Sequence, residues 1–190
     1  MQRLLAIVDQ VREHYVSAYL ESLLAFGAVH SPAGPEVLLE IQHDTSPAFR
    51  LYRVDMASNS DTGLKIQEVN LSTHLDFLEV VAYDVNGARI SLQPMAWNDV
   101  EFRVLREFDR AELETWALQW LDVDDEREQD LNGLQGVIHS VSEPEKQAEA
   151  FTFSIDFGSA PVDALASLIA LLSSRGAREI EIKSSALSQD

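Results

Sequence analysis

Cysteine is absent from this chain of 190 residues, and bases are scarce: 14 lysines and arginines stand against 32 aspartates and glutamates. Without cysteine, disulfides, thiolate catalysis and cysteine-ligated zinc or iron–sulfur sites are excluded. The formal net charge of −18 at pH 7 opposes nucleic-acid binding, because that affinity comes from Lys and Arg neutralising phosphates. We therefore expect no nucleic-acid partner and no cofactor.

Long apolar runs are also missing. The first one, Leu4 to Val8, is cut short by Asp9 and Glu13, so it does not form the core of a signal peptide. The apolar segment from Val162 to Leu172 is too short to span a bilayer. These features predict a soluble protein that does not enter a membrane, with the cytoplasm as its default location.

Several enzyme motifs are missing as well: no phosphate-binding GxxxxGK[ST] loop, HExxH, GxSxG or SxxK occurs. The tripeptide Asp156-Phe157-Gly158 matches the metal-binding tripeptide of protein kinases, but neither the HRD loop nor the strand lysine of that family accompanies it, and we interpret it as a coincidence. The turn from Gly158 to Pro161 could cradle an anion with backbone N–H groups, yet Asp156 and Asp163 flank it. An ordinary strand-to-helix connection is the favoured interpretation.

The clearest structural pattern lies between Phe151 and Lys183. Four apolar side chains alternate with polar ones from Phe151 to Phe157, which predicts a strand with one buried face. Pro161 opens an apolar helical face, and Gly176 is placed to end that helix in the left-handed conformation. Ile180 and Ile182 then mark a second strand.

The N-terminal half has its own pattern. Apolar residues at helical spacing predict a helix from Leu4 to about Gly27, with Tyr15 and Tyr19 in the core. Five strands are expected to follow as an antiparallel meander, with Asn86-Gly87 as a two-residue hairpin turn. Their predicted ranges are Val37 to Gln42, Phe49 to Met56, Leu64 to Leu71, Phe77 to Asp84 and Arg89 to Gln93. Together they would form an N-terminal α+β unit spanning residues 1–97.

Residues 98–190 predict a second α+β unit. A strand from Val100 to Leu105, a helix opened by Asp109 and a strand from Gly136 to Ser142 precede the Phe151 to Lys183 segment. The resulting order β-α-β-β-α-β is ferredoxin-like. It predicts that the Val100 to Leu105 strand lies between the two strands of that segment, with Arg103 on the face away from the helices.

Acidic residues are concentrated after the helix that Asp109 opens. The run consists of Asp122, Asp124, Asp125, Glu126, Glu128 and Asp130. A calcium loop starting at Glu128 fails at its twelfth position, where His139 replaces the required glutamate. The two remaining interpretations are a solvated loop and a docking site for a basic partner.

A second candidate site contains His74 and Asp76. On a strand these two side chains would share one face, with Glu68 nearby, and such a set could bind a metal or perform acid–base chemistry. Pairs of this kind also arise by chance.

Three hypotheses for function follow. The first is a non-enzymatic protein-binding or regulatory protein, such as an inhibitor or an immunity-type partner of a basic protein. The alternative is a small metal-dependent or acid–base enzyme that uses His74, Asp76 and Glu68. The third, small-ligand sensing by the ferredoxin-like half, rests on fold analogy. A homo-oligomer is compatible with all three.

Overall fold

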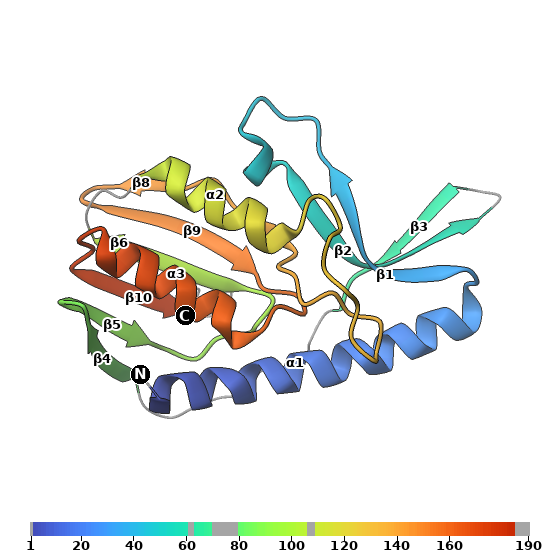
Figure 1. Ribbon diagram of the computed structural model, residues 1–190, viewed down its shortest axis with the longest axis horizontal. Helices are drawn as coiled ribbons and strands as arrows, with labels where there is room; N and C mark the ends of the chain where they lie inside the picture. The colour runs from blue at the N-terminus through green and yellow to red at the C-terminus, as the bar shows by residue number, and fades with distance from the viewer. Residues whose placement is uncertain (1, 61–62, 70–79, 106–108, 185–190) are drawn as a thin grey trace.

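A long N-terminal helix joins two β-sheets in the computed structural model, which describes residues 2–60, 63–69, 80–105 and 109–184 (Figure 1). This helix, α1 (Gln2–Val29), runs along one side of the molecule and passes both sheets. Its buried residues recur every three or four positions, as the sequence predicted: Leu4, Val8, Val11, Tyr15, Tyr19 and Phe26. The helix continues two residues beyond its predicted end at Gly27.

The first sheet is antiparallel and has the order β1-β2-β3. Its strands are β1 (Ala33–Glu40), β2 (Leu51–Ser60) and β3 (Gly63–Gln67). A short 3-10 helix, η1 (Pro47–Phe49), lies between the first two strands, where the sequence had predicted the start of a strand. This sheet packs beside α1 because Ala33 and Met56 belong to the apolar core that α1 completes.

The second sheet is mixed, with the order β4-β5-β10-β6-β9-β7, and β8 also pairs with β9. The bounds are β4 (Val81–Val85), β5 (Ala88–Leu92), β6 (Val100–Leu105), β7 (Ser140–Val141), β8 (Glu145–Gln147), β9 (Ala150–Asp156) and β10 (Glu179–Lys183). The strand predicted from Gly136 to Ser142 is therefore reduced to two residues. Main-chain groups of residues 137–139 instead bond to other elements.

The predicted five-stranded meander is wrong in its last two members. β4 and β5 form the expected hairpin, in which Asn86 and Gly87 both have positive φ angles of 50° and 83°. However, β5 pairs in parallel with β10 and so extends the second sheet. The hydrogen bonds between β5 and β10 therefore cross the boundary proposed between residues 97 and 98. Independent folding of residues 1–97 and 98–190 stays a prediction.

The predicted neighbours of β6 are confirmed. β6 lies between β9 and β10 and is antiparallel to both. The inward residues are fully buried as expected: Phe102, Val104, Phe153, Ile155, Ile180 and Ile182. Arg103 is exposed on the other face, 4.0 Å from Glu181. The protein is thus α+β, and the ferredoxin-like description stays an interpretation because β4 and β5 add two strands to that arrangement.

Two helices cover one face of the second sheet (Figure 1). α2 (Arg110–Leu121) begins at Asp109, whose carboxylate accepts a hydrogen bond from Ala111 N at 2.9 Å, as an N-cap should. α3 (Val162–Ser174) follows Pro161. Between them, Trp116 donates its indole N–H to Ser167 at 2.9 Å. No helix among the described residues is long and apolar enough to cross a membrane.

Candidate functional site

A buried polar cluster lies where β1, β2, α1 and the residues before β7 meet. Its centre is His139, whose main chain bridges the two sheets: its N–H donates to Asp156 O at 2.8 Å, and its carbonyl accepts from Arg53 N at 2.7 Å. Its side chain is 1% exposed. The main chain of His139 is therefore fixed by both sheets, and its imidazole is buried between them.

Two carboxylates take opposite sides of this ring. Glu36 Oε1 lies 3.2 Å from Nε2, and Asp55 Oδ1 lies 3.0 Å from Nδ1. The second contact is an ion pair and not an aligned hydrogen bond, since Nδ1 has no partner in hydrogen-bonding geometry among the described residues. Glu36 and Asp55 are themselves 1% and 2% exposed. A buried carboxylate requires such a counter-charge.

The backbone at Glu36 is adapted to this role. Its φ angle of 52° is left-handed, an uncommon conformation for a residue other than glycine, and it interrupts the β1–β2 ladder. Glu36 Oε2 accepts from Gln135 N at 2.5 Å, while Oε1 accepts from the Ser159 hydroxyl. Ser159 Oγ in turn accepts from Gly136 N at 2.9 Å. The carboxylate thus ties β1 to the connection between β9 and α3.

Asp55 is anchored from α1 and from the segment after β3. Its Oδ1 accepts from the Tyr15 hydroxyl at 2.8 Å, and its Oδ2 accepts from Val69 N at 2.5 Å. Burial alone would raise the pKa of Asp55, but the contact with His139 and these hydrogen bonds hold it below its ordinary value. Burial and the nearby acids raise the pKa of Tyr15 well above its ordinary value.

His139 is consequently a cation at neutral pH. Burial lowers its pKa, yet Asp55, Glu36 and Asp156 outweigh burial and raise the pKa to about 10. In Asp156, by contrast, burial outweighs the effect of the His139 cation. Burial is the largest effect there and raises the pKa to about 7. Burial together with Asp55 also raises the pKa of Glu68 to about 7. The site therefore holds one strong cation and two carboxyl groups that titrate near neutrality.

This cluster contains the residue types of a nucleophilic triad, but not its geometry. The Ser159 hydroxyl donates to Glu36 and not to His139, and it is 1% exposed. An imidazolium with a carboxylate on each side cannot accept the serine proton. The arrangement instead stabilises the junction between the two sheets through paired charges.

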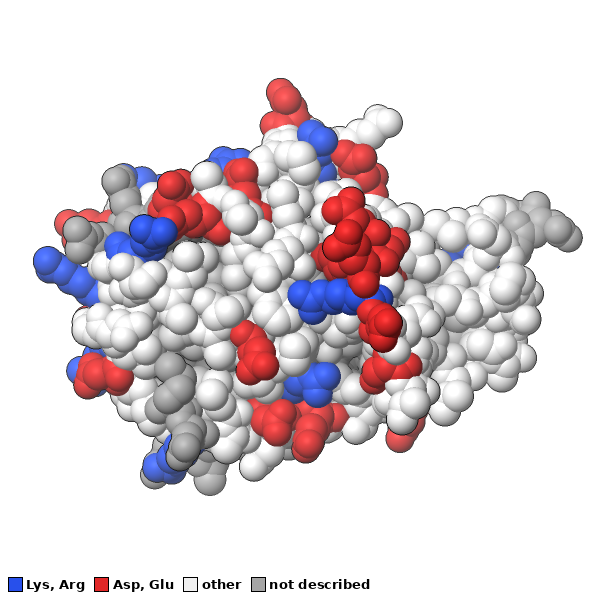
Figure 2. All heavy atoms as spheres, viewed as in Figure 1, with Lys and Arg blue, Asp and Glu red and all other residues white. Residues whose placement is uncertain are grey.

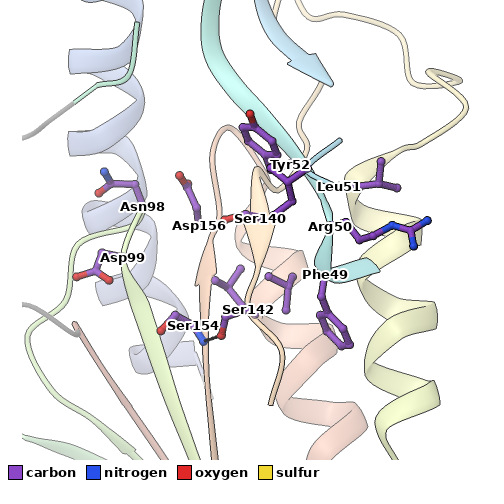
Figure 3. A pocket seen from close by; sticks show the side chains of 13 residues that line it. Phe49, Arg50, Leu51, Tyr52, Asn98, Asp99, Ser140, Ser142, Ser154 and Asp156 are labelled. Atoms are coloured by element: carbon purple, nitrogen blue, oxygen red, sulfur yellow. Dashed lines mark hydrogen bonds between the residues drawn. The ribbon is translucent and has the colours of Figure 1, made fainter. Parts of the chain in front are cut away.

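A cavity of about 510 Å³ lies next to this cluster, and Figure 3 shows the side chains that line it. Phe49 to Tyr52 line one side, Asn98 and Asp99 the other, and Asp156 lies between them. The remaining lining residues are Ile41, Ser140, Val141, Ser142, Ser154 and Ile155. The Asp156 side chain is 24% exposed, so it is the member of the cluster that reaches the cavity. Cavities of this size commonly accept small ligands.

Arg53 organises the predicted acidic run. Its side chain is 2% exposed, and it makes five hydrogen bonds, one for each guanidinium N–H. Two of them cap the end of α2 at Leu121 O and Asp122 O, at 2.8 and 2.7 Å. Another pairs with Asp125 at 2.7 Å.

Other acids of this run also have structural contacts. The Asp122 carboxylate accepts from Glu126 N and Arg127 N, and Asp130 accepts from Asn132 N and Leu134 N. Asp124, Glu126 and Glu128 are exposed, and among the described residues their carboxylates make no hydrogen bond or ion pair.

The remaining site residues predicted from sequence are His74, Asp76, Glu68 and the turn from Gly158 to Pro161. His74 and Asp76 lie outside the described residues, whereas Glu68 accepts a hydrogen bond from Asp55 N at 3.3 Å. At the proposed anion turn, Gly158 N donates to Asp156 and Ala160 N to Val137 O, so these N–H groups already have partners. Within the described part of the chain no group of three or more acidic or histidine residues is placed to hold a metal ion.

Sequence reasoning missed Glu36, Asp55, His139 and Ser159. The available signal was Asp55 itself, a carboxylate between Val54 and Met56 in an apolar strand. Comparison of the chain with family models, with curated proteins and with solved structures finds no match, so the function has to be argued from this geometry.

Proposed function

We propose that this protein binds and regulates a basic protein, and that the loop after α2 is the part that recognises it. The observation that carries the proposal is the fixed display of three carboxylates on that loop. Asp124, Glu126 and Glu128 are exposed, and Figure 2 shows acidic side chains gathered over this region. Such a surface would steer a positively charged partner toward it.

The contacts beneath the loop favour recognition over simple solvation. Arg53 binds Asp125, and Arg127 donates to Gly136 O at 2.8 Å while its guanidinium stacks over Trp120. Arg53 is therefore buried, and the partly exposed Arg127 is held by contacts within the protein. Because the loop is already ordered by these contacts, binding would lose little conformational entropy.

Leu131 adds an apolar element to the same loop, since its side chain is fully exposed. Acidic groups around one apolar anchor suit an inhibitor or immunity-type protein that covers a basic surface of its target. The location that we propose is the cytoplasm, and no nucleic acid or membrane partner belongs to this proposal.

A charge-neutralising variant tests it. Asp124→Asn, Glu126→Gln and Glu128→Gln together remove three charges that have no structural partner among the described residues. The matched control is Asp9→Asn, Glu13→Gln and Glu21→Gln, which makes the same change on the exposed side of α1. Affinity capture from extracts of the source organism, followed by titration of the isolated partner, should show binding by the wild type and the control but loss with the loop variant.

The dependence of binding on salt concentration is a second test of the proposal. At about 1 M salt the Debye length is about 3 Å, so an electrostatic complex should dissociate. Retention of the same partner by both triple variants, or at high salt, would contradict the proposal, as would the absence of any saturable partner.

A second candidate function is acid–base chemistry that includes Glu68. The observation in its favour is the pKa of about 7 that burial and Asp55 give this carboxyl group. His74 and Asp76 would complete the site in this proposal. Titration of the protein with Zn²⁺ and Mn²⁺, and hydrolysis of p-nitrophenyl esters across pH 5–9, should then respond to Glu68→Gln. A protein that neither binds metal nor hydrolyses the esters would remove this candidate.

A further inference from the structure

The cavity beside Asp156 has the composition of a binding site for a small cation. Its two acidic residues are Asp156 and Asp99, and Ser140, Ser142 and Ser154 belong to the same lining. The other part is apolar, formed mainly by Ile41, Phe49, Leu51, Val141 and Ile155. A ligand that fits both parts has a compact charged or polar head and an apolar body.

Asp156 lines this cavity and has one carboxylate oxygen without a hydrogen-bond donor among the described residues. Its Oδ1 accepts from Gly158 N at 2.8 Å, whereas its Oδ2 lies 4.0 Å from His139 Nδ1, beyond hydrogen-bonding distance. Among the described residues nothing donates a hydrogen bond to Oδ2. An oxygen of a mostly buried carboxylate that borders a cavity and lacks a donor is a natural partner for a ligand N–H group.

An anionic ligand does not suit the lining. Arg50 is the one base in it, and Figure 3 shows its side chain directed away from the centre of the cavity. Its Nε pairs with Glu40 at 3.0 Å, and its Nη1 donates to Thr45 O at 3.0 Å. The Arg50 guanidinium is thus already paired, and the carboxylates of Asp156 and Asp99 would repel an anionic ligand.

We propose that this cavity binds a primary amine carried on an apolar or aromatic group, with the ammonium at Asp156 Oδ2 and the apolar group against Phe49, Val141 and Ile155. This inference is independent of the acidic loop, because none of the residues 122–130 lines the cavity. It gives the protein a small-ligand site on the junction between its sheets.

Binding should depend on pH because the ammonium prefers ionised Asp156. The groups that act electrostatically on this carboxyl are His139, Asp55, Asp99, Tyr15, Tyr19 and Glu68. With a pKa of about 7, Asp156 is mostly protonated at pH 6 and mostly ionised at pH 8. The affinity for an amine should therefore increase about tenfold over this range.

Benzylamine is the probe, and benzyl alcohol is its uncharged analogue. In a protein-observed NMR titration, benzylamine should shift the amides of residues 140–142 and 154–156 with millimolar affinity, as expected for a fragment of this size. Benzyl alcohol should bind at least tenfold more weakly. Asp156→Asn should remove the difference between the two probes, whereas Asp9→Asn, an equal charge change on α1, should leave it intact.

The wild type alone also tests the proposal, so a poorly folded Asp156→Asn variant would not leave it open. An affinity for benzylamine that rises about tenfold from pH 6 to pH 8, with no change for benzyl alcohol, supports the site. The absence of shifts at residues 140–142 and 154–156, equal binding of both probes, or a pH-independent affinity would each overturn it.

Discussion

The ring of His139 lies directly over Gly158. A Cβ added at residue 158 would be 2.1 Å from His139 Cδ2 and 2.4 Å from Nε2, far inside van der Waals contact. Gly158 also has a φ angle of 48°, which is left-handed. The glycine of the Asp-Phe-Gly tripeptide thus has a structural reason of its own: it makes room for the buried imidazolium.

We expect Gly158→Ala to destabilise the protein by about 3 kcal/mol or more, because left-handed strain adds to a collision with a ring that is fixed on both sides. Urea denaturation would measure this loss. Gly133→Ala is a control for strain alone, since Gly133 has a φ angle of 84° and no atom near its added Cβ; it should cost about 1 kcal/mol.

Gly27→Ala controls for both effects, because Gly27 lies in α1 with open space around it. This variant should be neutral or stabilising by up to about 1 kcal/mol. If Gly158→Ala were no worse than Gly133→Ala, the close approach of the His139 ring would be wrong.

The His139 cation should be essential to the fold. In His139→Gln the carboxylates of Glu36 and Asp55 lose their shared counter-charge, and the loss of stability at pH 7 should be about 3–5 kcal/mol. The deficit should shrink as the pH is lowered, since protonation of Asp55 removes an unpaired buried charge. His43→Gln, on an exposed histidine, should change stability by less than about 0.5 kcal/mol. Equal effects of the two variants would contradict the ion cluster.

Stability should decrease as the pH rises from about 5 to 10. The pKa of His139 in the folded protein, about 10, lies above its unfolded value of about 6.5, so its contribution is complete below pH 6.5 and is lost as the pH rises through 10. Asp156 and Glu68 act in the same direction between pH 4 and 7, because their folded pKa values of about 7 are also raised. Asp55 opposes them only in acid, where its lowered pKa makes protonation destabilising.

Calorimetry at several pH values measures this trend, and a difference of about 3 kcal/mol would correspond to about 6–12 °C in Tm. Repetition at high salt separates the buried cluster from repulsion among surface acids, which salt screens. His139→Gln should flatten the curve above pH 7. A wild-type stability that is constant or rises across this range would refute the assigned charge state of His139.

Local patterns predicted the elements of this fold better than its connections. The alternation around Phe153 and Ile155 identified β9, its buried face and its place beside β6, because period-2 burial is a local property. The parallel pairing of β5 with β10 joins distant segments, and nothing in the apolar alternation of either strand distinguishes it from a neighbour in a meander. The prediction that all five N-terminal strands form one meander failed for that reason.

The buried charges were unpredictable for a related reason. Glu36 and His139 are 103 residues apart, and a polar residue within a strand pattern ordinarily indicates a solvent-facing position. Here the second sheet covers that position and supplies the counter-charge. The acidic run, in contrast, was visible in sequence, but Arg53 as its organiser was not.

Arg53 provides the last prediction. Arg53→Gln removes the guanidinium group that pairs with Asp125. The carbonyl groups of Leu121 and Asp122 at the end of α2 then lose their hydrogen-bond donors. We expect a loss of about 3–5 kcal/mol, typical of breaking one member of a buried ionic network. Hydrogen exchange should also accelerate in residues 121–127 more than in α3, since the loop loses its attachment to β2.

The matched control is Arg103→Gln, which changes an exposed arginine on β6 that lies 4.0 Å from Glu181. An exposed pair of this kind contributes little, and the variant should lose less than about 1 kcal/mol. If Arg53→Gln left the exchange of residues 121–127 unchanged, the acidic loop would not depend on Arg53 for its order. The loop would then not be preorganised by Arg53 for a basic partner.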